Sequence, residues 1–201
     1  MLKDRFFNLC HRYCSDNNIV NPLYKDLLLN YTSKDRHYHN LEHIRSIFKA
    51  LDGIELSDAL EFAIFYHDII YDVESNKNEE LSALFCKNAL RKLDVSNDII
   101  SKAIKIILDT KRHIPSINDS KYMIDADIFY FSFEKDKYLE TTKLIRQEYK
   151  IYDDKTYTKG RVEFLKSLLS KEVIYYTKEF RKYEKKAREN MKFEIEYLLN
   201  S

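Results

Sequence analysis

The chain has 201 residues, of which only 2 are glycine and 2 are proline. Hairpin turns and phosphate-binding loops need glycine for positive φ angles, so this composition excludes a multi-stranded sheet, a P-loop and a Rossmann nucleotide site. The 34 basic and 33 acidic side chains leave a net charge of +1, which provides no extended positive field for a nucleic-acid backbone. We therefore expect an all-α protein that forms a single domain over residues 1–201 and binds no extended nucleic acid.

Apolar residues recur at spacings of three and four along most of the chain, which predicts a bundle of roughly eight to ten helices. The expected helices cover residues 2–15, 22–31, 40–51, 57–71, 78–93, 97–111, 120–131, 134–150, 158–169 and 177–199. Ser57, Ser96 and Asp119 are predicted N-caps, because their side chains can accept the first backbone N–H bonds of the helices that follow. Pro22 is expected in the first turn of its helix.

No signal for export or membrane insertion is visible. The segment Met1–Arg5 mixes an acid with its bases and no apolar run follows it, and the most apolar stretch, Ala59–Tyr71, is too short to cross a bilayer. The chain has three cysteines, which is an odd number and too few for a disulfide scaffold. We expect a cytoplasmic protein with no membrane partner.

Four of the six histidines, His37, His39, His43 and His67, fall within 31 residues. His39 and His43 are four positions apart, so they can share one side of a helix that begins near Asn40. His67 is followed by Asp68 inside an apolar and aromatic run, where burying both groups unpaired would be costly. A divalent cation removes that cost, because neutral imidazole and carboxylate are its natural ligands.

Asp127 is a further acid within an apolar segment, and with His43, His67 and Asp68 it completes a predicted set of four metal ligands. A mixed nitrogen and oxygen set suits Mn, Fe, Zn, Co or Ni better than Mg, and Asp68 could bridge a second ion. The plainer alternative is a buried His–Asp pair that satisfies itself through hydrogen bonds.

The ordered residues His43, His67-Asp68 and Asp127 resemble the H…HD…D signature of the HD superfamily of metal-dependent phosphohydrolases, which are all-helical. Further segments look like the successive motifs of a bacterial subfamily of predicted HD phosphohydrolases: Arg36–Ile44, Phe65–Asp72, Asn78–Ala83, Thr110–His113, Asp125–Asp127, Ile145–Tyr149 and Tyr157–Arg161. The resemblance covers about residues 36–161, with the terminal helices expected to pack on this core. It implies hydrolysis of a phosphoester or phosphoanhydride of a small nucleotide and no particular substrate.

A second resemblance concerns the segment Tyr38–His43, which is similar to the Tyr-His-Asn-x-x-His motif of cyclic-nucleotide phosphodiesterases. That likeness implies that His43 binds the metal and that His39 protonates the leaving oxygen. The chain carries Asp72 four residues after Asp68, where the phosphodiesterase pattern has histidine, so specificity for cyclic nucleotides does not transfer.

Other charged residues near these motifs have two open interpretations. Arg36, Lys111 and His113 are candidates to contact phosphate oxygens, or are ordinary surface groups. Glu79 or Glu80 could hold a catalytic water next to the metal, or could favour the start of their helix through its dipole. The expected catalytic residues are His39, Asp68 and Glu79, acting on a small phosphorylated substrate. The sequence does not indicate an oligomeric state.

Two other functions compete with this one. His39–His43 fits the H-x-x-E-H pattern of zinc peptidases, in which Glu42 would be the base, although such an enzyme would leave His67, Asp68 and Asp127 without a role. The other is a non-catalytic helical module that keeps a metal for structure or senses a nucleotide.

Overall fold

The computed structural model describes residues 2–200, and all regular structure in this range is helical, which confirms the all-α expectation. It contains eleven α-helices and one short 3₁₀ helix. In chain order they are α1 (Leu2–Cys10), α2 (Asn17–Tyr31), α3 (Leu41–Ala50), α4 (Asp58–Tyr66), α5 (Asn78–Lys92), α6 (Asn97–Thr110), α7 (Asn118–Asp127), η1 (Phe129–Ser132), α8 (Lys135–Glu148), α9 (Asp154–Leu169), α10 (Lys178–Arg181) and α11 (Glu184–Asn200).

The helices group into two compact units, an N-terminal unit that ends at Ala126 and a C-terminal unit that begins at Asp127. The expectation of a single domain over residues 1–201 is not tested by this grouping and stays a prediction. No helix among the described residues is long and apolar enough to span a membrane.

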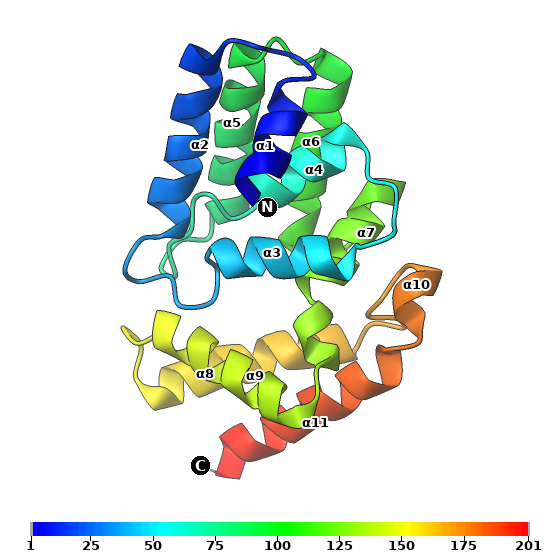
Figure 1. The fold of residues 1–201 in the computed structure, drawn as a ribbon. Coiled ribbons are helices and arrows are strands. Elements are labelled where there is room, and N and C mark those ends of the chain that lie inside the picture. Colours follow the sequence, from blue (N-terminus) through cyan, green and yellow to red (C-terminus); the bar gives the residue numbers. More distant parts are fainter. Residues whose placement is uncertain (1, 201) are drawn as a thin grey trace. The chain divides into compact units, whose positions relative to one another are not determined.

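Helix α4 is the centre of the N-terminal unit. Every residue of α4 after Asp58 is buried, and α1, α3, α5 and α6 all pack against it (Figure 1). Helices α5 and α6 also pack extensively against each other. Apart from Asp58 and Glu61, α4 consists of apolar and aromatic residues on all sides, as expected of a helix that its neighbours surround. The segment that follows α4 therefore starts from a rigid, buried base.

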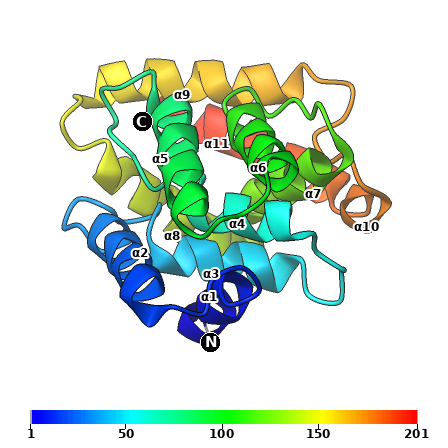
Figure 2. The same ribbon diagram turned by 90° about the horizontal axis from the view of Figure 1, so that it is seen from above.

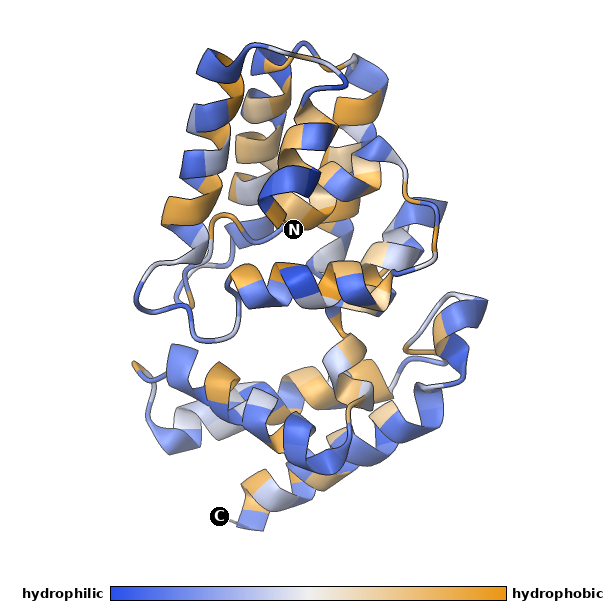
Figure 3. Ribbon diagram, viewed as in Figure 1, coloured by the Kyte–Doolittle hydropathy of each residue, from blue (hydrophilic) through white to orange (hydrophobic). Residues whose placement is uncertain are grey.

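The C-terminal unit is organised around α11, which lies beside α9 (Figure 2) and also packs against η1. Hydrophilic residues dominate α11, and its buried side consists of a few residues only (Figure 3). One of them is Glu194, whose carboxylate accepts bonds from Arg161 Nε at 2.7 Å and Nη2 at 3.1 Å and from the Tyr138 hydroxyl. Arg161 Nη2 also donates to Tyr130 Oη at 3.2 Å, so α8, α9, α11 and η1 share one buried polar network.

Local capping explains several helix starts, and two of the predicted caps are confirmed. Ser57 Oγ accepts from Leu60 N at 3.1 Å and Ser96 Oγ accepts from Ile99 N at 3.5 Å. The predicted cap Asp119 is wrong, since α7 already begins at Asn118 and Asp119 lies in its first turn. Asp119 instead accepts a bond from the Ser57 hydroxyl at 2.6 Å.

Several predicted boundaries differ from the structure; for example, α1 ends at Cys10 rather than at residue 15. Helix α2 begins at Asn17, capped by Asp16, so Pro22 lies inside the helix rather than in its first turn. Helix α4 ends at Tyr66 instead of residue 71, and α9 begins four residues before the predicted start at 158. The expected last helix, 177–199, consists of the separate helices α10 and α11.

Candidate metal centre

Three ligand atoms from two segments of the N-terminal unit converge. They belong to His43, His67 and Asp68, and all lie within 4.8 Å of one another. His43 Nε2 is 3.2 Å from His67 Nε2, and His67 Nε2 is 3.2 Å from Asp68 Oδ2. The two histidines are 3% and 1% exposed. The structure thus brings together three of the four predicted ligands.

His43 is placed by the start of α3. The preceding residue Asn40 caps this helix, because its Oδ1 accepts from Glu42 N at 2.8 Å. Asn40 Nδ2 also donates to His37 O at 2.9 Å, which fixes the turn before the helix. His43, in the first turn of α3, therefore projects from a fixed helix end.

His67 and Asp68 are placed by the end of α4, where the chain leaves the helix. His67 Nδ1 lies 3.0 Å from the carbonyl oxygen of Ile64, one turn earlier. Asp68 N donates to the Tyr31 hydroxyl of α2 at 3.2 Å. Beyond them, Ile70 N and Ile70 O both bond to the Ser82 hydroxyl, at 3.1 and 3.2 Å, which ties the segment to α5.

The bond to Ile64 determines the chemistry of the cluster. A carbonyl oxygen can only accept, so His67 Nδ1 donates and carries a proton. In the neutral ring Nε2 then presents a lone pair, which faces the carboxylate oxygen of Asp68. Two electron-rich atoms at 3.2 Å repel each other unless a cation or a proton lies between them. The three side chains can therefore hold a metal ion, and their donor set suits one.

Helix α4 itself contains a buried acid, Glu61, whose charge is compensated in a different way. Glu61 is 5% exposed, and Arg5 Nε donates to its carboxylate at 2.8 Å. Arg12 Nη2 lies 3.6 Å from the same carboxylate. Arginine thus neutralises Glu61, whereas the Asp68 carboxylate has the imidazole nitrogens of His67 and His39 at 3.2 and 4.0 Å.

His39 lies beside the three-residue cluster and is more accessible. Its Nε2 is 4.0 Å from Asp68 Oδ2, and its side chain is 19% exposed. The ring stacks on Tyr71 with centroids 4.2 Å apart and is 5.5 Å from the ring of His43. This position, next to the ligand group but not within it, suits a residue that transfers a proton.

Arg36 is placed differently from the phosphate contact that we expected. Its Nη1 donates to His39 O at 3.0 Å and to Asp68 O, and its Nη2 donates to Ile69 O at 2.8 Å. The guanidinium also lies 4.9 Å from the ring centroid of Tyr31. Arg36 therefore joins the turn before α3 to the segment after α4, and a phosphate contact stays a prediction.

Lys111 is engaged with the two candidate acids at the start of α5. Its Nζ donates to Glu80 Oε1 at 2.5 Å and lies 3.5 Å from Glu79 Oε2. The hydrogen bond from Lys111 lowers the pKa of the Glu80 carboxyl and raises the pKa of Lys111. Because the pair is exposed, solvent screens it and it adds little stability. Glu79 and Glu80 stay candidates for binding a water.

The other two predicted site residues lie at helix ends. His113 follows α6 with a left-handed φ of 51°, and its side chain is half-buried. Asp127 is the last residue of α7 and is not among the three residues of the cluster. Its role as fourth ligand stays a prediction.

The rival zinc-peptidase pattern has a less favourable geometry. The Glu42 side chain is 75% exposed and forms an ion pair with Arg45 on the same helix face. The cluster joins His43 to His67 and Asp68 rather than to His39 and Glu42. The geometry therefore favours the residues of the His67-Asp68 pair as partners of His43.

Sequence reasoning missed two contributors to this site. Tyr31 binds Asp68 N from 37 positions away, and Ser82 holds Ile70 from 12 positions away. Neither contact leaves a local pattern in the sequence, because a tyrosine or a serine on an apolar helix face is ordinary.

Comparison of the chain with models of known protein families, with curated proteins and with solved structures finds no match. What the site can do is therefore read from its own residues.

Proposed function

We propose that this protein is a metal-dependent phosphohydrolase that cleaves a phosphoester or phosphoanhydride of a small nucleotide. The observation that carries the proposal is the cluster of buried His43, buried His67 and half-buried Asp68, whose ligand atoms lie within 4.8 Å of one another. The order of the motifs supports assignment to the HD superfamily, with Asp127 as the fourth ligand. The all-α fold agrees with that assignment.

Two imidazoles and the carboxylates of Asp68 and Asp127 form the proposed ligand set, which favours Mn, Fe, Zn, Co or Ni over Mg. Such an ion supplies Lewis acidity to a phosphoryl oxygen and makes a water molecule acidic enough to attack near neutral pH. The hydrogen bond from His67 Nδ1 to Ile64 O fixes the orientation of the ring, as is usual for metal-binding histidines. Arg36 holds the backbone carbonyl of Asp68 in place.

His39 is the proposed general acid. Its ring lies next to the cluster, and the stacked Tyr71 ring limits its orientation. The imidazole of histidine can donate a proton at neutral pH, and the leaving oxygen of a phosphoester needs one. In this arrangement His43 binds the metal while His39, one turn away, donates the proton.

The charges around the site favour a substrate with few phosphates. Arg36 is bonded to backbone carbonyls and Lys111 to Glu80, so both cations are already engaged. The metal would then neutralise most of the substrate charge. A small nucleotide fits this limit, whereas a polynucleotide demands several phosphate contacts.

The test combines metal analysis with a hydrolysis screen on the full-length protein. Wild-type protein, Asp68→Asn and His43→Ala are stripped with chelator, refilled with first-row metals and assayed for bound metal and for phosphate released from nucleotides. His11→Ala is the matched control, because His11 is exposed and its Nε2 contacts Asn17 Oδ1 at 3.1 Å, outside the cluster.

We expect wild-type protein and His11→Ala to bind metal and hydrolyse at least one nucleotide, with both properties lost in the two ligand variants. A protonated His67 would satisfy the same contacts without a metal, so equal metal binding by all four proteins contradicts the assignment. Bound metal without hydrolysis across the screen would favour the non-catalytic module instead. Peptide cleavage that depends on Glu42 would favour the peptidase.

A further inference from the structure

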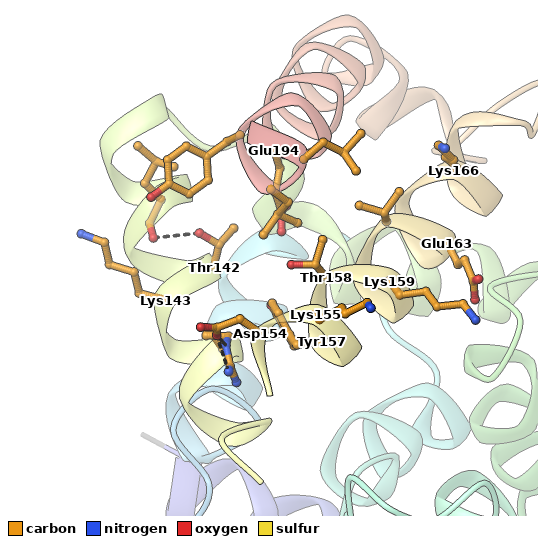
Figure 4. Close-up of a pocket in the computed structure, with 16 residues that line it drawn as sticks. Thr142, Lys143, Asp154, Lys155, Tyr157, Thr158, Lys159, Glu163, Lys166 and Glu194 are labelled. Carbon is orange, nitrogen blue, oxygen red and sulfur yellow. Dashed lines mark hydrogen bonds and ion pairs between the residues drawn. The ribbon is translucent and has the colours of Figure 1, made fainter. Parts of the chain in front are cut away.

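A second candidate site lies entirely within the C-terminal unit. Residues of α8, α9 and α11 line a pocket of about 890 Å³. Figure 4 shows Thr142, Thr158 and Glu194 extending from these three helices toward the space between them. The pocket shares no residue with the group of His43, His67 and Asp68, and the inference below is independent of the proposed hydrolase activity.

Part of the pocket wall is apolar. Leu139, Val162 and Leu198 contribute aliphatic surface from the three helices. Tyr197 and Leu199, near the end of α11, are 58% and 63% exposed and also line the pocket. Exposed apolar side chains that adjoin one another in a hollow can form a surface that a ligand covers. The wall can therefore bury an apolar body.

Some charged residues of the pocket form ion pairs and others do not. Arg146 Nη2 bonds to Asp154 at 2.7 Å, and Glu194 is neutralised by Arg161. Within residues 2–200 the other charged lining residues form no hydrogen bond or ion pair; they are Lys143, Lys155, Lys159, Lys166 and Glu163. Four ammonium groups against one carboxylate leave the pocket positively charged at neutral pH, so its charge is complementary to an anion.

Size and chemistry together define the occupant. A volume of about 890 Å³ lies within the range of small-molecule sites and is far larger than an inorganic anion needs. Lysines can bury their aliphatic stems along an apolar body while their ammonium groups meet a negative head. We propose that this pocket binds a small organic anion, an aromatic ring or acyl chain that carries a carboxylate, sulfonate or phosphate group.

The test uses two fluorescent probes that share one apolar body. The anion 8-anilinonaphthalene-1-sulfonate carries the head group, and uncharged N-phenyl-1-naphthylamine lacks it. Both are titrated into the folded full-length protein. In Lys143→Gln/Lys159→Gln two lysines of the pocket lose their charge, and in Thr158→Trp a bulky ring fills the space between the helices. The matched control is Lys178→Gln/Lys185→Gln, because these lysines are 91% and 88% exposed and do not line the pocket.

We expect the anion to bind one site per chain and more tightly than the neutral probe. Substitution of the two pocket lysines should lower the affinity for the anionic probe about three- to tenfold, whereas substitution of the two control lysines should change that affinity less than twofold. Neither double variant should change the affinity for the neutral probe. Thr158→Trp should weaken both probes. Equal affinity of the two probes, equal effects of the two lysine pairs, or undiminished binding to Thr158→Trp would each overturn the proposal. So would a change of oligomeric state on Thr158→Trp substitution, which would identify the pocket as a contact between copies of this chain.

Discussion

His39 and His43 are four residues apart but have different surroundings, and this difference predicts separable effects. His43 is 3% exposed and in contact with His67, whereas the His39 side chain is 19% exposed and stacks on Tyr71. We expect His39→Ala to keep its metal while turnover falls by about 10²–10⁴-fold. His43→Ala should lose metal and turnover together. Metal analysis and single-turnover rates on the same preparations check this, and loss of metal in both variants would refute the division of roles.

Arg36 positions the site through backbone carbonyls, so its substitution should act on the metal rather than on the substrate. The fork of the guanidinium reaches Asp68 O and Ile69 O together, which the single ammonium group of lysine cannot reproduce. We expect Arg36→Lys to weaken metal binding about 10–100-fold, the range typical of groups that hold metal ligands in place. Arg45→Lys is the control, since Arg45 pairs with exposed Glu42 on the surface of α3. An unchanged metal affinity with a raised KM would instead indicate a direct phosphate contact.

His113 and Asp94 allow a matched test of backbone strain. Both have positive φ angles, 51° and 58°, at the ends of α6 and α5, a conformation that glycine adopts without cost. We expect His113→Gly and Asp94→Gly each to raise the free energy of unfolding by about 0.5–1 kcal/mol. If His113 contacts phosphate as predicted, only His113→Gly should also lower kcat/KM, by about tenfold. Urea titrations and steady-state kinetics on both variants decide this, and equal kinetics would leave His113 as a helix cap alone.

Helix ends show how far local sequence rules reach. Ser57 and Ser96 mark helix starts correctly because a cap depends on a few neighbouring residues. The prediction from Pro22 was wrong, because α2 begins earlier at the cap Asp16 and accommodates Pro22 in its interior, where the proline supplies no backbone N–H. The apolar run 57–71 predicted a longer helix than α4. Periodicity alone does not reveal that Ile70, beyond the end of α4, bonds to the Ser82 hydroxyl through its N–H and its carbonyl oxygen instead of continuing the helix.

The buried ion pair between α9 and α11 predicts a strong effect at the scale of these elements. Side chains of Arg161 and Glu194 are 7% and 4% exposed. Glu194→Gln keeps the shape but leaves the Arg161 charge without its counterion, so we expect the free energy of unfolding to fall by about 3–5 kcal/mol. Lys186→Met is the control, because Lys186 pairs with a Glu134 side chain that is 88% exposed. This substitution should lower the free energy of unfolding by less than about 1 kcal/mol. Thermal or urea unfolding monitored by circular dichroism measures both, and similar small losses would contradict this account.

At the scale of the whole molecule, the composition was sufficient to predict the fold class. The pattern of histidines and the adjoining Asp68 was sufficient to predict the three members of the cluster. The scarcity of glycine and proline excluded sheets, and the described residues contain helices alone as regular structure. The division after Ala126 could not be predicted, because it falls at the end of a helix with no glycine, proline or serine nearby. The bonds from Arg36 to backbone carbonyls could not be predicted from the sequence either, since an arginine beside a metal-binding motif can contact a phosphate as well as the backbone.

Buried tyrosines predict that both units lose stability in alkali. Burial raises the pKa of Tyr66 well above its usual value and also raises those of Tyr130 and Tyr138. An unfolded chain releases these protons near pH 10, whereas the folded chain keeps them, so stability is unaffected below about pH 9 and is lost progressively above about pH 10. Each such tyrosine should contribute about 1.4 kcal/mol per pH unit to that loss. Urea titrations across this range, followed by circular dichroism and by tyrosinate absorbance, measure the slope.

Tyr66→Phe makes this last prediction specific to one group. The Tyr66 hydroxyl is fully buried and has no hydrogen-bond partner within the described chain, so replacing it removes a polar group without breaking a bond. We expect Tyr66→Phe to keep or slightly raise stability at neutral pH. Above about pH 10 its stability should fall less steeply than that of the wild type, by about 1.4 kcal/mol per pH unit. An identical alkaline slope would show that Tyr66 ionises in the folded state as easily as in the unfolded chain, and its burial in α4 would then not govern its titration.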